Sequence, residues 1–287
     1  MSTAVAPKST PSIRSLPTLL ALARADARRF ARHPLFLFSV VVILLMLSFG
    51  IATRSVVTVS AVEGLVFPAF LLGVFGFVVA HRLTTSLRRS GDLADTSPTG
   101  QQRRTIALCL ACLVPMAAGV ATIAALIVFG AVWPPESIPP GQQVAWFGHE
   151  PTVDMLAALA ATLPLAALGG PLLGVAVARW APFRGSALLG VVILVIGAAF
   201  GDALPTPWFT ISPWFNFMGG EYSDGQYHTT WLRDGAEPLW TCGYYAALCG
   251  LAVVAALLRD NANRRPLLLA GALLTAVAAA CLVIPVV

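Results

Sequence analysis

The sequence predicts an all-α membrane protein with six to seven spanning helices, and its composition, apolar stretches and arginine distribution all support this class. Of the 287 residues, 57% are hydrophobic and 11% are charged, whereas soluble domains carry about 25% charged residues. A helix needs about 20 apolar residues to cross the hydrocarbon core. We expect spans near residues 35–52, 64–80, 106–133, 155–178, 186–204, 239–258 and 267–287.

Lysine and arginine residues alternate with these spans. They gather in the N-terminal tail and after the second, fourth and sixth spans, which leaves only Arg54 and Arg233 on the other side. Because cytoplasmic loops carry the excess of Lys and Arg, we expect a multi-pass protein of the cell (plasma) membrane with a cytoplasmic N-terminus. Seven spans would put the C-terminus outside. Lipid headgroups account for the net charge of +5, so we expect no nucleic-acid partner.

The segment before the first span divides into a tail and an amphipathic helix. Residues 1–14 have a Ser-, Thr-, Ala- and Pro-rich composition that is typical of disorder. Residues 15–33 predict a helix in the cytoplasmic interface, with arginines off its apolar stripe. The alternative is a plain extension of the first span. Pro34 ends the helix, and the transmembrane domain follows over 34–287. The stripe consists of Leu16, Leu20, Ala23, Ala27 and Phe30.

Small residues inside the spans indicate close helix packing. Gly170 and Gly174 form a small-x-x-x-small pair in the fourth span, and Gly197 and Gly201 form another in the fifth. Such pairs let helix backbones approach each other in lipid. We also expect a packing role for the C-x-x-C pair at residues 109–112, because it lies among apolar residues with no histidine nearby.

Two features on the predicted outer side are candidates for an outer gate or hairpin. Glu63 lies at the outer end of the second span, where a carboxylate costs less than at mid-membrane. The gap 202–238 repeats a Pro-Trp-Phe motif, which favours a re-entrant or interfacial hairpin. The alternatives are an interfacial acid and a plain aromatic-belt loop. The aromatic residues of the repeat are Trp208, Phe209, Trp214 and Phe215.

Motifs of catalysis and nucleotide binding are absent from the sequence. It contains no G-x-x-x-x-G-K-[ST], no H-E-x-x-H and no G-x-S-x-G. The four histidines are scattered over both predicted sides of the membrane. We therefore expect no catalytic residue, no metal site and no cofactor in this chain.

An arginine-rich segment at residues 87–104 lies on the inner side between the second and third spans. Its order of residues, the preceding interfacial helix and the late Pro/aromatic hairpin together resemble the ABC-2 type permeases, the membrane subunits of ABC exporters. The matching residues are Arg89, Gly91, Ser97-Pro98 and Arg103. The family's acidic residue before the arginine is missing, and the span at 267–287 exceeds the family's usual six.

The resemblance implies that this segment is a coupling loop that docks on a separate ATP-binding subunit, which holds ATP and Mg. It also implies a dimer in the lipid bilayer, formed with a second copy or a paralogue, and a lipid-like, drug-like or peptide cargo. The loop after the fourth span would be the second contact. The coupling-loop residues are Arg88, Arg89, Gly91, Asp92, Leu93, Asp95, Ser97, Pro98 and Arg103, and the second contact comprises Arg179, Pro182, Phe183 and Arg184.

Two other functions remain open at this point. One is a membrane anchor or assembly subunit without transport activity, in which the basic loop only sets topology. The other is an intramembrane Mg-dependent prenyl-diphosphate enzyme, since Asp92 and Asp95 form a D-x-x-D motif whose oxygens suit a hard cation. That enzyme needs a second acid-rich inner motif, and residues 259–263 offer only Asp260.

Overall fold

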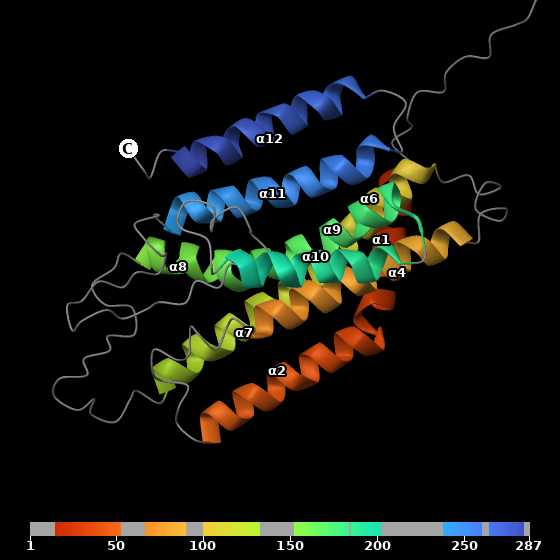
Figure 1. The fold of residues 1–287 in the computed structure, drawn as a ribbon. Helices are drawn as coiled ribbons and strands as arrows, with labels where there is room; N and C mark the ends of the chain where they lie inside the picture. Colours follow the sequence, from red (N-terminus) through yellow and green to blue (C-terminus); the bar gives the residue numbers. More distant parts are fainter. Residues whose placement is uncertain are drawn as a thin grey trace, which may run out of the picture.

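The computed structural model describes the chain as a bundle of helices (Figure 1). The described residues are 15–52, 67–89, 100–132, 152–183, 185–201, 238–259 and 264–283. No β-strand occurs in these ranges. The predicted all-α class is therefore confirmed for this part of the protein.

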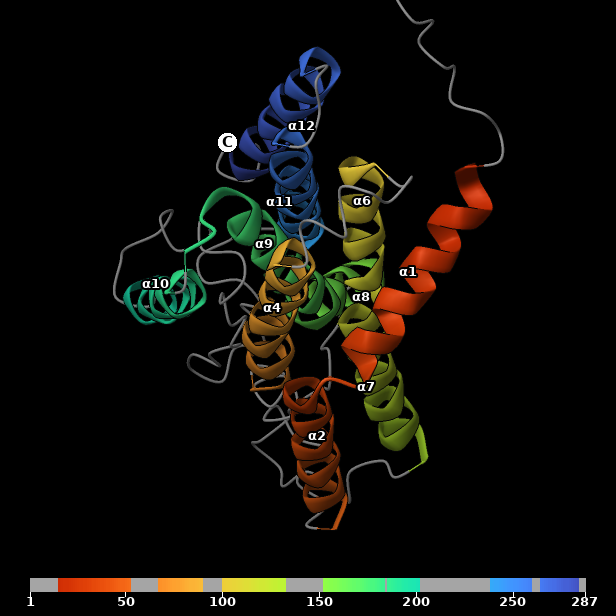
Figure 2. The same ribbon diagram turned by 90° about the vertical axis from the view of Figure 1, so that its right-hand side faces the viewer.

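The chain enters the bundle through two helices that meet at a sharp angle. Helix α1 (Ser15–Ala31) and helix α2 (Pro34–Ala52) are bent by 61° relative to each other. Proline starts a helix readily because the first turn needs no partner for its N–H. Helix α1 packs against α6 (Gln101–Ala111) at an inclined angle (Figure 2). That α1 lies in a membrane interface stays a prediction.

Two long helices, each with a wide π-helical turn, occupy the centre of the bundle. The first runs from residue 67 through η2 (Leu71–Phe75) into α4 (Gly76–Arg89). The second joins α8 (Thr152–Ala160), η3 (Ala161–Leu165) and α9 (Ala166–Trp180). Pro164 lies inside η3. Because proline lacks the N–H of a regular i→i−4 bond, a wider turn accommodates it.

Glycines bring these two central helices into backbone contact. A Cβ atom added to Gly170 would overlap the carbonyl oxygen of Gly73, and one added to Gly174 would overlap that of Phe77. Close packing through the Gly170–Gly174 pair is therefore confirmed. The second predicted pair, residues 197 and 201, belongs to α10 (Ser186–Gly201), but the surroundings of these glycines lie outside what the structure describes.

The remaining helices surround this central pair (Figure 2). Helix α10 lies on one flank against α9 and α4, while α11 (Pro238–Leu258) packs on α8 and α9. Helix α12 (Arg265–Val283) packs on the outside of α11. Helix α7 (Leu113–Val132) continues α6 beyond Cys112.

Four described helices are long and apolar enough to cross a membrane, and the bent α1–α2 pair would make a fifth. The apolar parts of α10 and α12 are shorter. Large exposed side chains such as Leu45 (65%) and Leu269 (72%) suit contact with lipid. The described part is thus that of a membrane-embedded helical protein, whereas six or seven spans stay a prediction. The four helices are Phe67–Ser86, Gln101–Phe129, Ala161–Trp180 and Leu239–Leu258.

Several helices extend beyond the predicted spans, because the search for apolar runs stops at polar residues that the bundle nevertheless buries. The helix that begins at residue 67 continues past the predicted span 64–80 to Arg89, with His81 and Thr84 buried. Helix α6 begins at Gln101, before the predicted start of the third span at residue 106. Arg103 therefore belongs to a helix, not to the loop before it.

Candidate functional site

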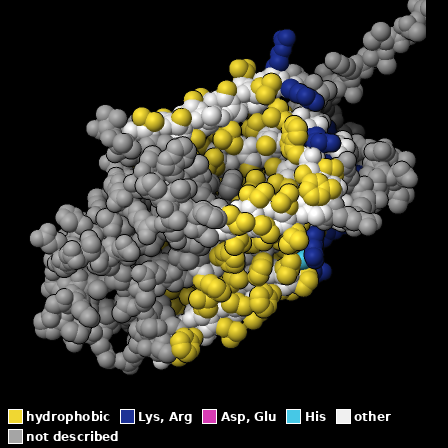
Figure 3. All heavy atoms as spheres, in the orientation of Figure 1, with side chains coloured by type: hydrophobic (Ala, Val, Ile, Leu, Met, Phe, Trp, Pro, Cys, Tyr) yellow, Lys and Arg dark blue, Asp and Glu magenta, His cyan; other side chains and the backbone are white. Residues whose placement is uncertain are grey.

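The described arginines gather at one end of the bundle, where α4, α9 and α11 end and where α6 and α12 begin (Figure 1). Figure 3 shows arginine side chains at that end of the visible face and hydrophobic side chains along its flank. Clustered cations of this kind create a positive field. The arginines whose side chains the structure describes are Arg24, Arg28, Arg29, Arg32, Arg82, Arg103, Arg104, Arg179, Arg259, Arg264 and Arg265.

A cavity of about 910 Å³ lies at this end between α4 and α10. This volume falls within the range of about 300–1,000 Å³ that is usual for small-molecule sites. One wall comes from one face of α4, the other from the first turns of α10, and the α9–α10 connection lies at the end. The lining residues are Val78, His81, Arg82, Thr85, Ser86, Pro182, Phe183, Ala187, Leu188 and Val191.

A buried hydrogen bond between His81 and Ser186 joins the two walls. The distance from His81 Nε2 to Ser186 Oγ is 2.8 Å, and Ser186 Oγ also lies 2.8 Å from the carbonyl oxygen of Phe183. Because a hydroxyl has one proton, Ser186 donates to Phe183 and accepts from His81. The proton of the neutral imidazole is therefore assigned to Nε2. This chain of bonds fixes α4 to the start of α10.

Trp180 fastens the end of α9 to the end of α11. Its Nε1–H donates to the carbonyl oxygen of Ala255 at 2.8 Å. In return, Arg259 Nη1 donates to the Trp180 carbonyl oxygen at 3.5 Å, and the guanidinium carbon lies 5.8 Å from the centre of the indole ring. This geometry is that of a cation–π contact. Trp180, the last residue of α9 before the α9–α10 connection, is therefore held in place by α11 and Arg259.

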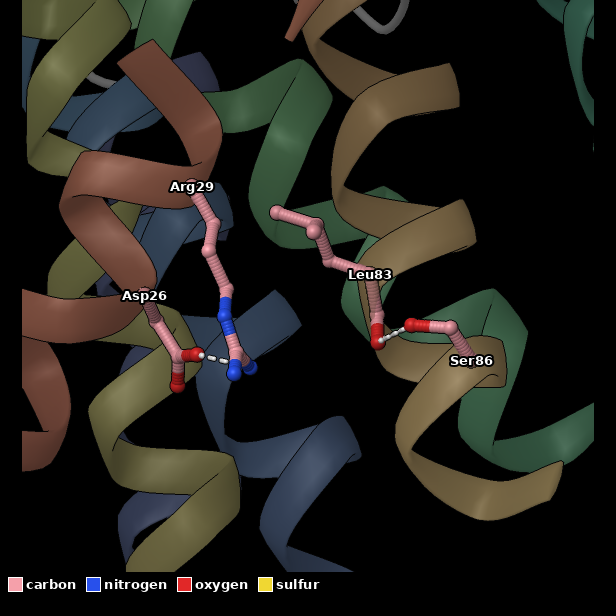
Figure 4. A network of polar contacts seen from close by, with 4 residues as sticks. All are labelled: Asp26, Arg29, Leu83 and Ser86. Carbon is pink, nitrogen blue, oxygen red and sulfur yellow. Dashed lines mark hydrogen bonds and ion pairs between the residues drawn. The ribbon is translucent and has the colours of Figure 1, made fainter. Parts of the chain in front are cut away.

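On the α1 side of this end, Asp26 and Arg29 form an ion pair at 3.5 Å (Figure 4). Figure 4 also shows Ser86 Oγ donating to the Leu83 carbonyl oxygen within α4, at 2.9 Å. Burial raises the pKa of Asp26, while Arg29 and Arg104 act in the opposite direction. Two arginines thus act on the charge of Asp26, one on its own helix and one on α6.

His33 lies at the corner between α1 and α2. Its Nδ1 accepts the backbone N–H of Leu35 at 3.3 Å. Burial lowers the pKa of His33, and the nearby positive charge of Arg82 lowers it further. The accepted hydrogen bond and the two causes of the lowered pKa all favour the neutral imidazole. The effect of Arg82 also shows that this corner lies near the α4 wall of the cavity.

The helix that leads into the predicted coupling loop and part of the predicted second contact lie at this end. Helix α4 ends at Arg89, where the predicted coupling loop starts, and Pro182 and Phe183 of the second region line the cavity beside Arg82. Phe183 is 52% exposed. Arg179 requires a correction, since it lies inside α9 and is only 6% exposed, which makes it unsuitable for direct contact with a docking subunit.

Most other predicted site residues fall outside the structural description. Helix α4 includes Arg88 and Arg89, but nothing is described of their side chains. The residues whose positions are not described are Gly91, Asp92, Leu93, Asp95, Ser97, Pro98 and Arg184 on the predicted inner side, and Glu63, Trp208, Phe209, Trp214 and Phe215 on the outer side.

Sequence reasoning missed the two contacts that organise this end. His81 and Ser186 are 105 residues apart, and Trp180 and Ala255 are 75 residues apart. Neither pair forms a local motif. The one available signal was that His81 and Ser186 are polar residues at the edges of apolar stretches, which the search for apolar runs treated as boundaries.

Among the described residues, no group of three His, Cys, Asp or Glu side chains is placed to hold a metal ion. No protein-family model, no curated protein and no solved structure matches this chain. Fold and site together define a class, a membrane-embedded helical protein with an arginine-rich end and a cavity in that end.

Proposed function

We propose that this chain is the transmembrane permease subunit of an ATP-driven ABC exporter in the plasma membrane, with six to seven spans. A separate ATP-binding subunit, holding ATP and Mg, docks on the arginine-rich end. The observation that carries the proposal is the juxtaposition of α4, which leads into residues 90–99, and the α9–α10 connection at one cavity. Two segments remote in sequence thereby offer one docking region.

The packing of α4 supports a mechanical role for the loop that follows it. A push on residues 90–99 reaches Arg89 and the rest of α4 directly, because helix and loop are continuous in the chain. Gly170 and Gly174 bring α9 into contact with the backbone of this helix, so we expect the two helices to move together. His81 and Trp180 extend the connection to α10 and α11. Closure of the ATPase subunits would thus shift several spans together.

The remaining parts of the proposal follow from the resemblance. The chain pairs with a second copy or a paralogue, its N-terminus lies in the cytoplasm, and hydrolysis is confined to the partner. The cargo class is lipid-like, drug-like or peptide.

The first test is purification of the tagged chain from its native membrane in a mild detergent, with mass spectrometry of the proteins that accompany it. We expect a P-loop ATPase. A double variant R88S/R89S should lose it, whereas R264S/R265S, which removes the same charge at the same end, should keep it. A chain that purifies without any ATPase contradicts the proposal and favours the membrane anchor or assembly subunit.

A second test separates docking from coupling. Gly91→Pro and Asp92→Arg should leave the protein inserted in the membrane but uncouple hydrolysis by the partner from transport in reconstituted vesicles. The readouts are phosphate release and cargo movement, measured on the same vesicles. Normal transport in both variants would contradict the assignment of the coupling loop.

A further inference from the structure

The cavity between α4 and α10 changes character along the bundle axis. Its deeper part is lined by Val78 on α4 and by Leu188 and Val191 on α10. Its outer part holds the polar residues Arg82, Thr85 and Ser86, with Pro182 and Phe183 of the α9–α10 connection beside them. Val78 and Thr85 are seven residues apart on one helix, which corresponds to about 10 Å along the axis. The cavity is therefore a pocket with a cationic end and an apolar end.

The position of this pocket matches the level of a lipid headgroup. The apolar helix Phe67–Ser86 reaches its arginine-rich end at these residues, so Arg82 lies where hydrocarbon gives way to headgroups. Helix α10 is on the flank of the bundle, and Leu188 is 71% exposed. An acyl chain in the surrounding bilayer can thus reach the apolar end from the side.

The polar groups at the cationic end specify the kind of headgroup. Arg82 is exposed and forms no ion pair with any acid whose side chain the structure describes. The hydroxyl of Thr85 directs its proton to the carbonyl oxygens of His81 and Arg82, at 3.0 and 3.1 Å. In this arrangement the Thr85 oxygen stays available to a ligand as an acceptor. A ligand that fits carries an anion for Arg82 and a hydroxyl donor beside it.

We infer that this pocket binds an anionic phospholipid with a hydroxyl-bearing headgroup, such as phosphatidylglycerol. The phosphate pairs with Arg82, a headgroup hydroxyl donates to Thr85, and one acyl chain lies along Val78, Leu188 and Val191. Basic pockets between membrane helices on the cytoplasmic side are known to take anionic headgroups. Lipid binding at this site needs no ATPase partner, so it can be tested on the isolated chain whether or not the proposed transport function holds.

The test uses the purified full-length chain in phosphatidylcholine vesicles. Phosphatidylglycerol with a photoreactive group on its acyl chain is added, and crosslinked peptides are mapped by mass spectrometry. A phosphatidylcholine probe with the same group is the control lipid. We expect the phosphatidylglycerol probe to label the peptides of α4 and α10 that line the pocket. Unlabelled phosphatidylglycerol should compete, and inorganic phosphate should not.

Two variants and one matched control make the result specific. Arg82→Gln should weaken labelling about fivefold, the factor expected for one arginine beside an anionic headgroup. Val191→Trp fills the apolar end without a change in charge and should also reduce labelling, which keeps the test valid if Arg82→Gln does not fold. Arg264→Gln, at the same end but outside the pocket, should label like the wild type.

Three results would overturn the inference. The first is equal labelling of the pocket by the two lipid probes. The second is undiminished labelling in folded Arg82→Gln and Val191→Trp proteins. The third is displacement of the phosphatidylglycerol probe by inorganic phosphate alone, which would assign the site to a free anion.

Discussion

Trp180 joins α9 to α11 through a hydrogen bond from its indole nitrogen and a cation–π contact on its ring face. Substitution can separate the two interactions. Trp180→Phe removes the hydrogen bond to the Ala255 carbonyl oxygen but keeps an aromatic face for Arg259. We expect a loss of about 1 kcal/mol, the net value of one hydrogen bond. Trp180→Ala should cost more, because the cation–π contact is lost as well. Thermal unfolding in detergent checks the order, and equal stability of all three proteins would contradict it.

His33 makes the stability of the α1–α2 corner depend on pH. Because burial and Arg82 hold its pKa below the ordinary value of 6.5, the neutral form favours folding. This stability is fully present above pH 6.5 and is lost as the pH falls through the folded-state pKa. We expect a lower unfolding temperature at about pH 5 than at about pH 8.

The control for that pH dependence is His33→Gln, whose side chain does not titrate but whose amide oxygen can still accept the N–H of Leu35. This variant should lose less stability on acidification than the wild type. If both proteins respond to pH equally, the effect arises elsewhere in the chain.

Among the elements, the α9 surface that packs on α4 is the least tolerant of added volume. Gly170→Ala places a methyl group on the Gly73 carbonyl oxygen, so the helices must separate. Overpacking of this kind costs about 1–3 kcal/mol. Gly100→Ala is the matched control, since a Cβ there meets nothing within 4 Å. Unfolding temperature and yield of folded protein in detergent are the measurements, and equal behaviour of the two variants would contradict the packing argument.

Elements also show where sequence reasoning succeeds and where it stops. The apolar period and Pro34 located the helices, because both act through local chain physics. The wide turn at η2 could not be foreseen, since its residues Leu71–Phe75 read as a regular apolar helix. Buried polar residues such as Thr84 blurred the helix ends, because only the fold shows that neighbours cover them. The pocket at Arg82 could not be predicted either, because it forms only where α4, the α9–α10 connection and α10 meet in the fold.

At the scale of the whole molecule, the concentration of arginines at one end predicts that this end faces the cytoplasm, and this orientation can be tested. In a variant without the native cysteines, Ser97→Cys and Ser137→Cys place single thiols in the predicted inner and outer loops. A membrane-impermeant thiol reagent applied to intact cells should label Ser137→Cys. It should reach Ser97→Cys only after lysis. The reverse pattern would contradict the predicted orientation.

The π-helical turn η2 has a geometric consequence for the arginine end. Such a turn accommodates one residue more than an α-turn, and each residue of an α-helix advances the side-chain direction by about 100°. The face that α4 presents beyond Gly76 is therefore out of phase with the face before Leu71. Conversion of that turn to a regular α-helical turn would rotate His81 and Arg82 about the helix axis, with the helical content of the protein unchanged.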